Sequence, residues 1–239
     1  MITKKCAQSF IGFAVTMLIC YITMYLMSFF TLSKWVGVSI GVGVFAVMLI
    51  LALVFRKNKL LPFIIIPINS IGDGLALSSL YVYLGAYPAI WETAVLFGAL
   101  LLAMLLYCIL TNVPYFRNHF IISMITYCVA IIVILITVTV VGVSENYPPQ
   151  IFYLAFMSLI PFIAFFISLA IKADSTVTHV RNMSRCSFAA LIVILIVVII
   201  IISQGDGLDG LGDGIGGGAD GTTAARRKRN PYDFTTFDI

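Results

Sequence analysis

The sequence predicts an all-α protein: a polytopic bundle of about seven transmembrane helices, followed by a disordered tail rich in glycine and aspartate. Composition is the first reason, because 62% of the 239 residues are hydrophobic and only 10% are charged, whereas about a quarter of a soluble domain is charged. Such a chain cannot cover a water-facing surface, so lipid must face much of it. The second reason is that the apolar residues gather in windows long enough to cross a bilayer.

Seven windows reach the roughly 20 apolar residues that a transmembrane helix needs. The first follows Lys4 and Lys5, is too long for the apolar part of a signal peptide, and precedes no cleavage site of small residues. We therefore expect it to remain as the first span, and residues 1–203 to form one transmembrane domain without room for a soluble catalytic domain. The predicted spans are residues 8–30, 35–55, 60–84, 89–110, 120–143, 151–171 and 187–203.

The basic residues predict the orientation of this bundle. With a cytoplasmic N-terminus, seven crossings place nearly all basic residues of the bundle inside, as the positive-inside rule requires. A re-entrant third window would instead move Arg117 and the later basic residues outside. We therefore expect a cell-membrane protein with its N-terminus in the cytoplasm and its C-terminus outside. The inner segments hold Lys4, Lys5, Arg56, Lys57, Lys59, Arg117, Lys172, Arg181 and Arg185, and the outer loops hold only Lys34.

The third window carries an acid near its centre. Asp73 is expected near the bilayer midplane, where an ionised carboxylate costs roughly 2.5–3.5 kcal/mol on insertion scales. Asn69 precedes it by four residues and therefore shares its helical face, with Ser70 beside it. These three residues are the predicted substrate- or ion-binding site.

The backbone around Asp73 is expected to be irregular. Pro67 lacks the N–H group that the helix needs one turn before the acid. Gly72 and Gly74 flank Asp73 on both sides. Together they predict a kinked or broken helix whose freed carbonyl groups need partners.

No predicted span contains a lysine or an arginine, so Asp73 has no cationic partner within the membrane part of the chain. Desolvation could keep it protonated, it could bind a proton, a sodium ion or a cationic substrate, or it could meet a basic residue of another subunit. The structural alternative is a neutral acid that is hydrogen-bonded to hydroxyl groups of neighbouring spans. Candidates for those hydroxyl groups are Thr16, Tyr21, Thr23, Tyr25, Tyr127 and Thr137.

Glu92 lies in the first turn of the fourth predicted span. A carboxylate at a helix N-terminus is stabilised by the helix dipole, which is the simpler interpretation. The functional alternative is a second acid at the outer mouth of a path to Asp73.

Two patterns of small residues predict close helix packing. Gly37 and Gly41 lie four residues apart in the second span, as do Ala94 and Gly98 in the fourth. We expect contacts within the bundle first, and contacts in a homo-oligomer second.

Residues 70–73, Ser-Ile-Gly-Asp, resemble the G-x-G-D element of intramembrane aspartyl proteases, with Ser70 in place of the first glycine. Such enzymes need a second membrane aspartate that shares a proton with the first. None of the other six windows has one, since Asp174 lies just beyond the sixth. We therefore do not expect an enzyme.

Metal and redox chemistry find little support in the sequence. His119 and His179 are far apart, without an H-E-x-x-H pattern. The five cysteines form no C-x-x-C pair and lie in predicted spans or inner segments, which argues for free thiols. We expect no metal and no cofactor.

Residues 204–239 differ in composition from the predicted spans. The run from Gly205 to Gly221 alternates glycine with aspartate and a few apolar residues, and such a chain loses too much entropy to fold alone. It predicts a flexible linker that carries a basic cluster and a terminal peptide, able to contact anionic lipid or a partner. The predicted partner-binding residues are Arg226, Arg227, Lys228, Arg229, Phe237 and Ile239.

Two functions are compatible with this pattern. The leading hypothesis is a small transporter or channel-like subunit that exchanges a proton or cation on the Asp73 carboxylate. The alternative is a scaffold or accessory subunit whose tail recruits a partner and whose Asp73 meets a basic residue of that partner. The expected partners are the lipid bilayer and a membrane protein or a second copy of the chain, and not nucleic acid, because the basic residues of the bundle serve as topology markers.

Overall fold

The computed structural model describes residues 2–30, 33–55, 58–84, 90–144 and 150–214, and every structural statement below concerns these residues. They form helices and no strand, as the sequence predicts. The chain divides into two compact units, Met1–Ser203 and Gln204–Ile239. The helices are α1 (Ile2–Met27), α2 (Lys34–Val54), α3 (Leu61–Leu84), α4 (Ile90–Leu110), the short α5 (Pro114–Asn118), α6 (Phe120–Ser144), α7 (Gln150–Ala170) and α8 (Thr176–Gly214).

Six of these helices, α1, α2, α3, α4, α6 and α8, are long and apolar enough in the described residues to cross a membrane. The chain is therefore a multi-pass membrane protein, and six of the predicted windows correspond to these helices. The sixth predicted window corresponds to α7, whose described apolar part is Ala155–Ala170 and is shorter than a full span. A crossing by α7 stays a prediction.

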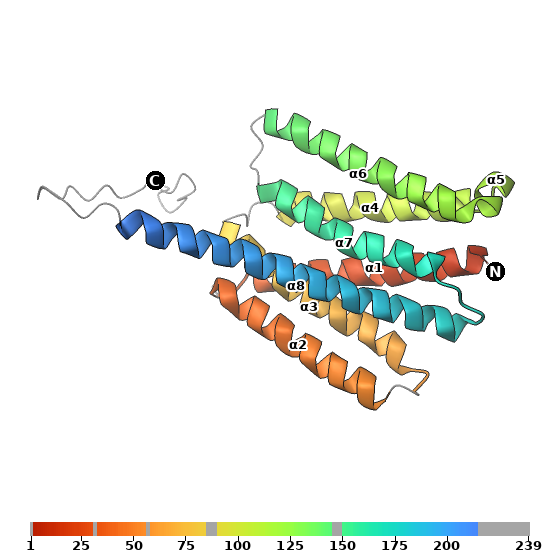
Figure 1. Ribbon diagram of the computed structural model, residues 1–239, viewed down its shortest axis with the longest axis horizontal. Coiled ribbons are helices and arrows are strands. Elements are labelled where there is room, and N and C mark those ends of the chain that lie inside the picture. The colour runs from red at the N-terminus through yellow and green to blue at the C-terminus, as the bar shows by residue number, and fades with distance from the viewer. Residues whose placement is uncertain (1, 31–32, 56–57, 85–89, 145–149, 215–239) are drawn as a thin grey trace, which may run out of the picture. The chain divides into compact units, whose positions relative to one another are not determined.

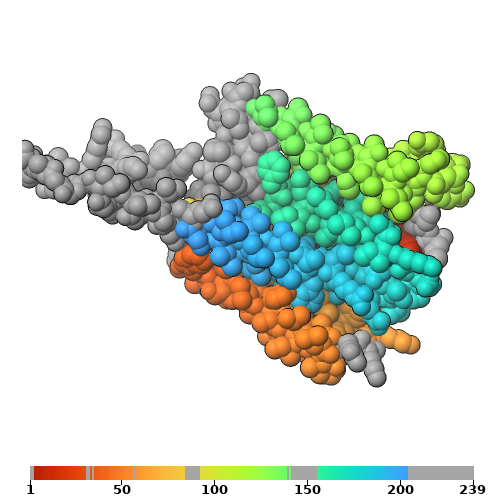
Figure 2. All heavy atoms as spheres, viewed as in Figure 1, coloured from red at the N-terminus to blue at the C-terminus, as the bar shows by residue number. Residues whose placement is uncertain are grey.

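In the first unit, α3 lies between α1 and α2, which both pack closely along it, and α8 also contacts α2 and α3. For example, the rings of Phe45 in α2 and Phe188 in α8 meet edge to face, with their centroids 5.5 Å apart. On the other side, α1 packs against α4 and α7, and α6 packs against α7 (Figure 1). On the face drawn in Figure 2, the atoms of α2, α8, α7 and α6 follow one another.

The core between α1, α4 and α7 is aromatic. The ring of Phe13 contacts that of Phe162 at a centroid distance of 5.6 Å, and Tyr107 contacts Phe166 at 5.0 Å. All four side chains are fully buried. By contrast α6, the least buried candidate span, turns apolar side chains such as Ile125 outward, as a lipid-facing helix does.

Successive long helices of the first unit run in opposite directions (Figure 1). The N-terminus, α5 and the start of α8 therefore lie at one end. This basic end, as we call it, carries the described basic residues that the sequence assigns to inner segments. They are Lys4, Lys5, Lys59, Arg117, Lys172, Arg181 and Arg185.

The last helix differs from the prediction at both ends. α8 begins at Thr176, well before the predicted start at Ser187, and continues to Gly214 instead of ending at Ser203. Once a helix is formed, each added residue contributes a backbone hydrogen bond, which offsets the low helix propensity of glycine. The helix therefore extends beyond residue 203, where the predicted tail begins, and the flexibility of that tail stays a prediction. The rest of the tail lies outside the described residues.

Candidate functional site

The candidate site is centred on Asp73, which lies in the middle of α3 and is only 2% exposed. α3 is the most buried of the candidate spans, because α1 and α2 pack along it and α8 contacts it through Ser187 and Leu191. Asn69 and Ser70, the two polar residues predicted to join Asp73, are fully buried as well. The structure therefore places all three inside the protein, away from lipid.

Glycines allow three neighbouring helices to approach α3 at the level of Asp73. A Cβ atom on Gly74 would lie 2.7 Å from the backbone oxygen of Cys20 in α1. On Gly72 it would lie 3.1 Å from the side chain of Leu191 in α8, and on Gly41 of α2 it would lie 3.4 Å from the backbone oxygen of Gly72. A larger residue at Gly74 would push α1 away from α3, and one at Gly72 would displace the Leu191 side chain, so these glycines allow the close packing that encloses Asp73.

The predicted helix break at Pro67, Gly72 and Gly74 does not occur. α3 is one α-helix from Leu61 to Leu84 that contains Pro67. Proline removes a single backbone hydrogen bond, and close packing on several sides holds the helix together across that position. The two glycines provide room for neighbouring helices, and a kink of α3 stays a prediction.

The polar atoms around Asp73 are incompletely paired. Both carboxylate oxygens of Asp73, and Oδ1 of Asn69, are buried without a hydrogen-bond partner among the described residues. Nδ2 of Asn69 donates to Oγ of Ser187 in α8 at 3.4 Å, and the Ser70 hydroxyl donates to the backbone oxygen of Ile66 at 2.7 Å. An unsatisfied buried polar group costs roughly 1–3 kcal/mol, so these oxygens are where a proton, a cation or a water molecule would bind.

Helix α1 brings further polar groups to this level. Cys20 is buried and packs beside Gly74, the residue that follows Asp73. α1 and α3 run in the same direction (Figure 1), so Thr16, one turn before Cys20, lies near the level of Asn69, one turn before Asp73. Thr16 is 1% exposed, and its Oγ1 has no partner within the described part of the chain. Unpartnered oxygens of two helices thus lie within about one turn of Asp73.

Three of the six hydroxyl groups proposed as structural partners of Asp73 form hydrogen bonds elsewhere. Those of Thr23 and Thr137 donate to backbone oxygens one turn earlier in their own helices, at 2.8 and 2.9 Å, and Tyr127 donates to a backbone oxygen of α4 at 2.6 Å. None of the six hydroxyl groups bonds to Asp73 in the described residues, which contradicts the structural alternative. The rings of Tyr21 and Tyr25 pack against Phe97 and Phe29.

Glu92 does not join this cluster. It is exposed in the first turn of α4, at the end of the first unit opposite the basic end (Figure 1). Its position fits stabilisation by the helix dipole. An acid at the mouth of a path to Asp73 remains a prediction.

The two pairs of small residues behave differently. Gly41 contacts α3 as described, and a Cβ atom on Gly37 would meet the backbone oxygen of Leu75 and the Ser79 hydroxyl, so α2 packs on α3 through both glycines. In α4, Ala94 is half-buried, and Gly98 is exposed with no atom of the described residues within 4 Å of a Cβ position. Packing within the bundle accounts for the first pair only. The tail residues Arg226, Arg227, Lys228, Arg229, Phe237 and Ile239 lie outside the described residues.

Sequence reasoning missed the contribution of α8. Ser187 bonds to Asn69, and His179 and Asn182 are buried nearer the basic end. These three positions, i, i+3 and i+8, have the spacing of one helical face. This periodicity was the available signal that a polar, inward-facing stretch precedes the apolar part of α8.

No protein-family model matches the chain, and neither the curated proteins nor the solved structures include a match. The function is therefore argued from the site alone.

Proposed function

We propose that this multi-pass membrane protein is a small transporter or channel-like subunit in which the Asp73 carboxyl group takes up and releases a proton or a small cation. The observation that supports the proposal is a carboxyl group 2% exposed, with both oxygens unpartnered among the described residues. An acid at membrane depth destabilises the protein, and a purely structural position would be served better by an apolar or a fully hydrogen-bonded residue.

The neighbouring oxygens suit this chemistry. Oδ1 of Asn69 and Oγ1 of Thr16 lack partners and are oxygen ligands of the kind that hard cations prefer. A protonated Asp73 could instead donate to Oδ1 of Asn69, which lies one turn away on the same face. Loading and release then require only that α1 or α8 moves enough to admit water.

The accessory-subunit alternative is less favoured by the geometry. Asp73 is enclosed by helices of its own chain, so a basic side chain of another subunit would have to displace α1, α2 or α8 to reach it. The proposed orientation, with the basic end in the cytoplasm, follows from the positive-inside rule.

Ion flux into liposomes that contain only the purified chain tests the proposal. A pH gradient and a sodium gradient are applied in turn, and proton and sodium uptake are followed. We expect uptake of one ion by the wild type, and a loss of at least about tenfold in Asp73→Asn, which keeps the shape but not the exchangeable charge.

Ser158→Ala is the matched control. Ser158 is a buried polar residue of α7 whose hydroxyl donates within its own helix at 2.8 Å, so its loss should leave the flux unchanged. Absence of flux in the wild type, or full flux in Asp73→Asn, would rule out the proposed function.

A further inference from the structure

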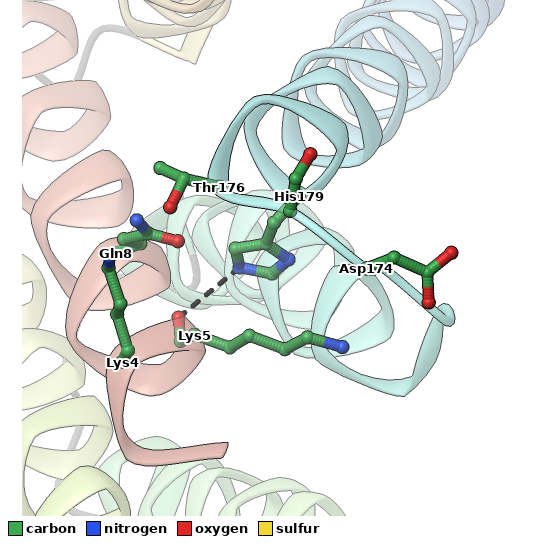
Figure 3. Close-up of a pocket in the computed structure, with 7 residues that line it drawn as sticks. Lys4, Lys5, Gln8, Asp174, Thr176 and His179 are labelled. Atoms are coloured by element: carbon green, nitrogen blue, oxygen red, sulfur yellow. Dashed lines mark hydrogen bonds between the residues drawn. The ribbon is translucent and has the colours of Figure 1, made fainter. Parts of the chain in front are cut away.

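A pocket of about 360 Å³ opens at the basic end, where the first turns of α1 meet the start of α8. It is separate from the Asp73 cluster in the middle of α3. Figure 3 shows its lining, in which α1 provides two lysines and a glutamine, and the start of α8 provides a histidine. The side chains labelled there are Lys4, Lys5, Gln8, Asp174, Thr176 and His179.

The pocket is rich in hydrogen-bond donors. Lys4 and Lys5 contribute two positive charges against the single negative charge of Asp174. The N-terminus of α8 also faces it, with Thr176 as the first helical residue. Ser175 caps the backbone N–H of Thr178 at 3.2 Å, which leaves the first N–H groups of the helix and its dipole for an anion.

The buried ring of His179 distinguishes this pocket from a surface that is merely charged. Its ring is fully buried, and Nε2 lies 3.2 Å from the backbone oxygen of Lys5 and 3.0 Å from the hydroxyl of Ser9. A backbone oxygen only accepts hydrogen bonds, so Nε2 carries a hydrogen and donates. The other ring nitrogen, Nδ1, has no partner in the described residues.

In Figure 3, Nδ1 points toward the side of the pocket where the Lys5 side chain and Asp174 lie. An unsatisfied buried nitrogen is unfavourable unless a ligand completes it. The remaining groups around the ring, Ser9 and Ser168, are uncharged hydroxyls that are 3.4 Å from each other. Lys4, Lys5 and Asp174 are therefore the charged groups of the pocket around His179.

We propose that this pocket binds a phosphate group. The Lys5 side chain and the start of α8 would hold its oxygens, and Lys4 would add to the positive charge of the pocket. His179, which would take up a second proton on Nδ1 as the anion binds, would donate a further charge-assisted hydrogen bond. The group could belong to the headgroup of an anionic phospholipid, since the pocket lies at the end of the spans, or to a soluble phosphate compound. The proposal does not depend on Asp73 or on the transport function.

Two variants separate an effect on ligand binding from an effect on folding. In His179→Gln the side-chain amide can still donate to the Lys5 backbone oxygen from a position close to that of Nε2, while the nitrogen that faces the pocket is removed. Lys4→Gln/Lys5→Gln removes the charges and keeps that backbone oxygen. The control is Lys59→Gln, an exposed lysine of the basic end that does not line the pocket.

The full chain is placed in nanodiscs, and its thermal unfolding midpoint is measured with two probes. Inorganic phosphate is titrated into phosphatidylcholine discs at constant ionic strength, and phosphatidic acid is added to the discs in a parallel series. A rise of the unfolding midpoint with inorganic phosphate identifies a soluble phosphate compound as a ligand. A rise of the midpoint only with phosphatidic acid identifies a lipid headgroup.

Either rise supports the proposal if the apparent affinity falls by at least about tenfold in both pocket variants and stays within about twofold in Lys59→Gln. If His179→Gln folds poorly, the lysine pair decides, because Lys4 is exposed and Lys5 is only half-buried. No rise with either probe, wild-type affinity in the lysine pair, or an equal loss in Lys59→Gln would overturn it.

Discussion

The side-chain amide of Asn69 donates to the hydroxyl oxygen of Ser187 at 3.4 Å and joins α3 to α8 one turn before Asp73. Both side chains are buried, so the bond fixes the face of α8 that closes over the site. It also leaves Oδ1 of Asn69 directed elsewhere and unpartnered in the described residues. The same residue thus supports the bundle with one atom and is available to the site with the other.

Ser187→Ala should therefore destabilise the protein by about 1 kcal/mol, since a buried donor on Asn69 loses its acceptor. Equilibrium unfolding in detergent measures this change. The Asn69→Ala/Ser187→Ala double-mutant cycle should show coupling between the two positions. If the two single changes add without coupling, the bond contributes nothing to stability.

Asp73→Asn should fold normally and be at least as stable as the wild type. The carboxyl group has no partner to lose in the described residues, and removing an ionisable group from membrane depth removes a desolvation penalty. The unfolding midpoint in detergent tests this, and it should not fall. A marked drop would mean that Asp73 makes a stabilising interaction and would favour a structural role over ion exchange.

Gly74→Ala should destabilise the bundle by about 1–3 kcal/mol, because the added methyl group would overlap the α1 backbone. Gly98→Ala offers a matched comparison, since nothing in the described residues lies within 4 Å of its Cβ position. That change should be neutral or slightly stabilising, because alanine has the higher helix propensity. Equal destabilisation by both substitutions would show that the close approach of α1 and α3 is not what requires glycine at position 74.

The proposed orientation can be tested with two single cysteines introduced into a cysteine-free background. Lys59 and Glu92 are both exposed. Lys59 precedes α3 and Glu92 lies in the first turn of α4, and these two helices begin at opposite ends of the first unit (Figure 1). In intact cells, a membrane-impermeant maleimide should label Glu92→Cys and should label Lys59→Cys only after permeabilisation. The reverse pattern would place the basic end outside.

Much of the fold could be predicted because lipid imposes long apolar windows, and each window became a helix. The start of α8 could not be predicted, because His179, Asn182 and Ser187 are polar residues that face other helices. Hydropathy alone assigns such a polar stretch to a loop. The prediction of a break in α3 was wrong for a similar reason, while the alternative of a kink stays a prediction. The low helix propensity of Pro67 and the two glycines indicated a break, but the packing that keeps the helix intact comes from α1, α2 and α8.

The position of Asp73 in the middle of a helix could be predicted from its place in the third window, whereas its neighbours could not. One sequence does not tell which helices meet, so Cys20, Ser187 and Leu191 are known as neighbours only from the structure. The pocket around His179 likewise joins segments from the two ends of the first unit's sequence. No local pattern in the sequence links them.

α3 has the lowest hydropathy of the candidate spans and is also the most enclosed by protein. A segment of this kind partitions into lipid poorly when it leaves the ribosome, because its polar residues have no neighbours yet. Its integration must then be cooperative, with α1 and α2 retained beside the insertion machinery until α3 can join them. Biogenesis of this protein should accordingly be most sensitive to changes in the first two helices, well before α8 has been synthesised.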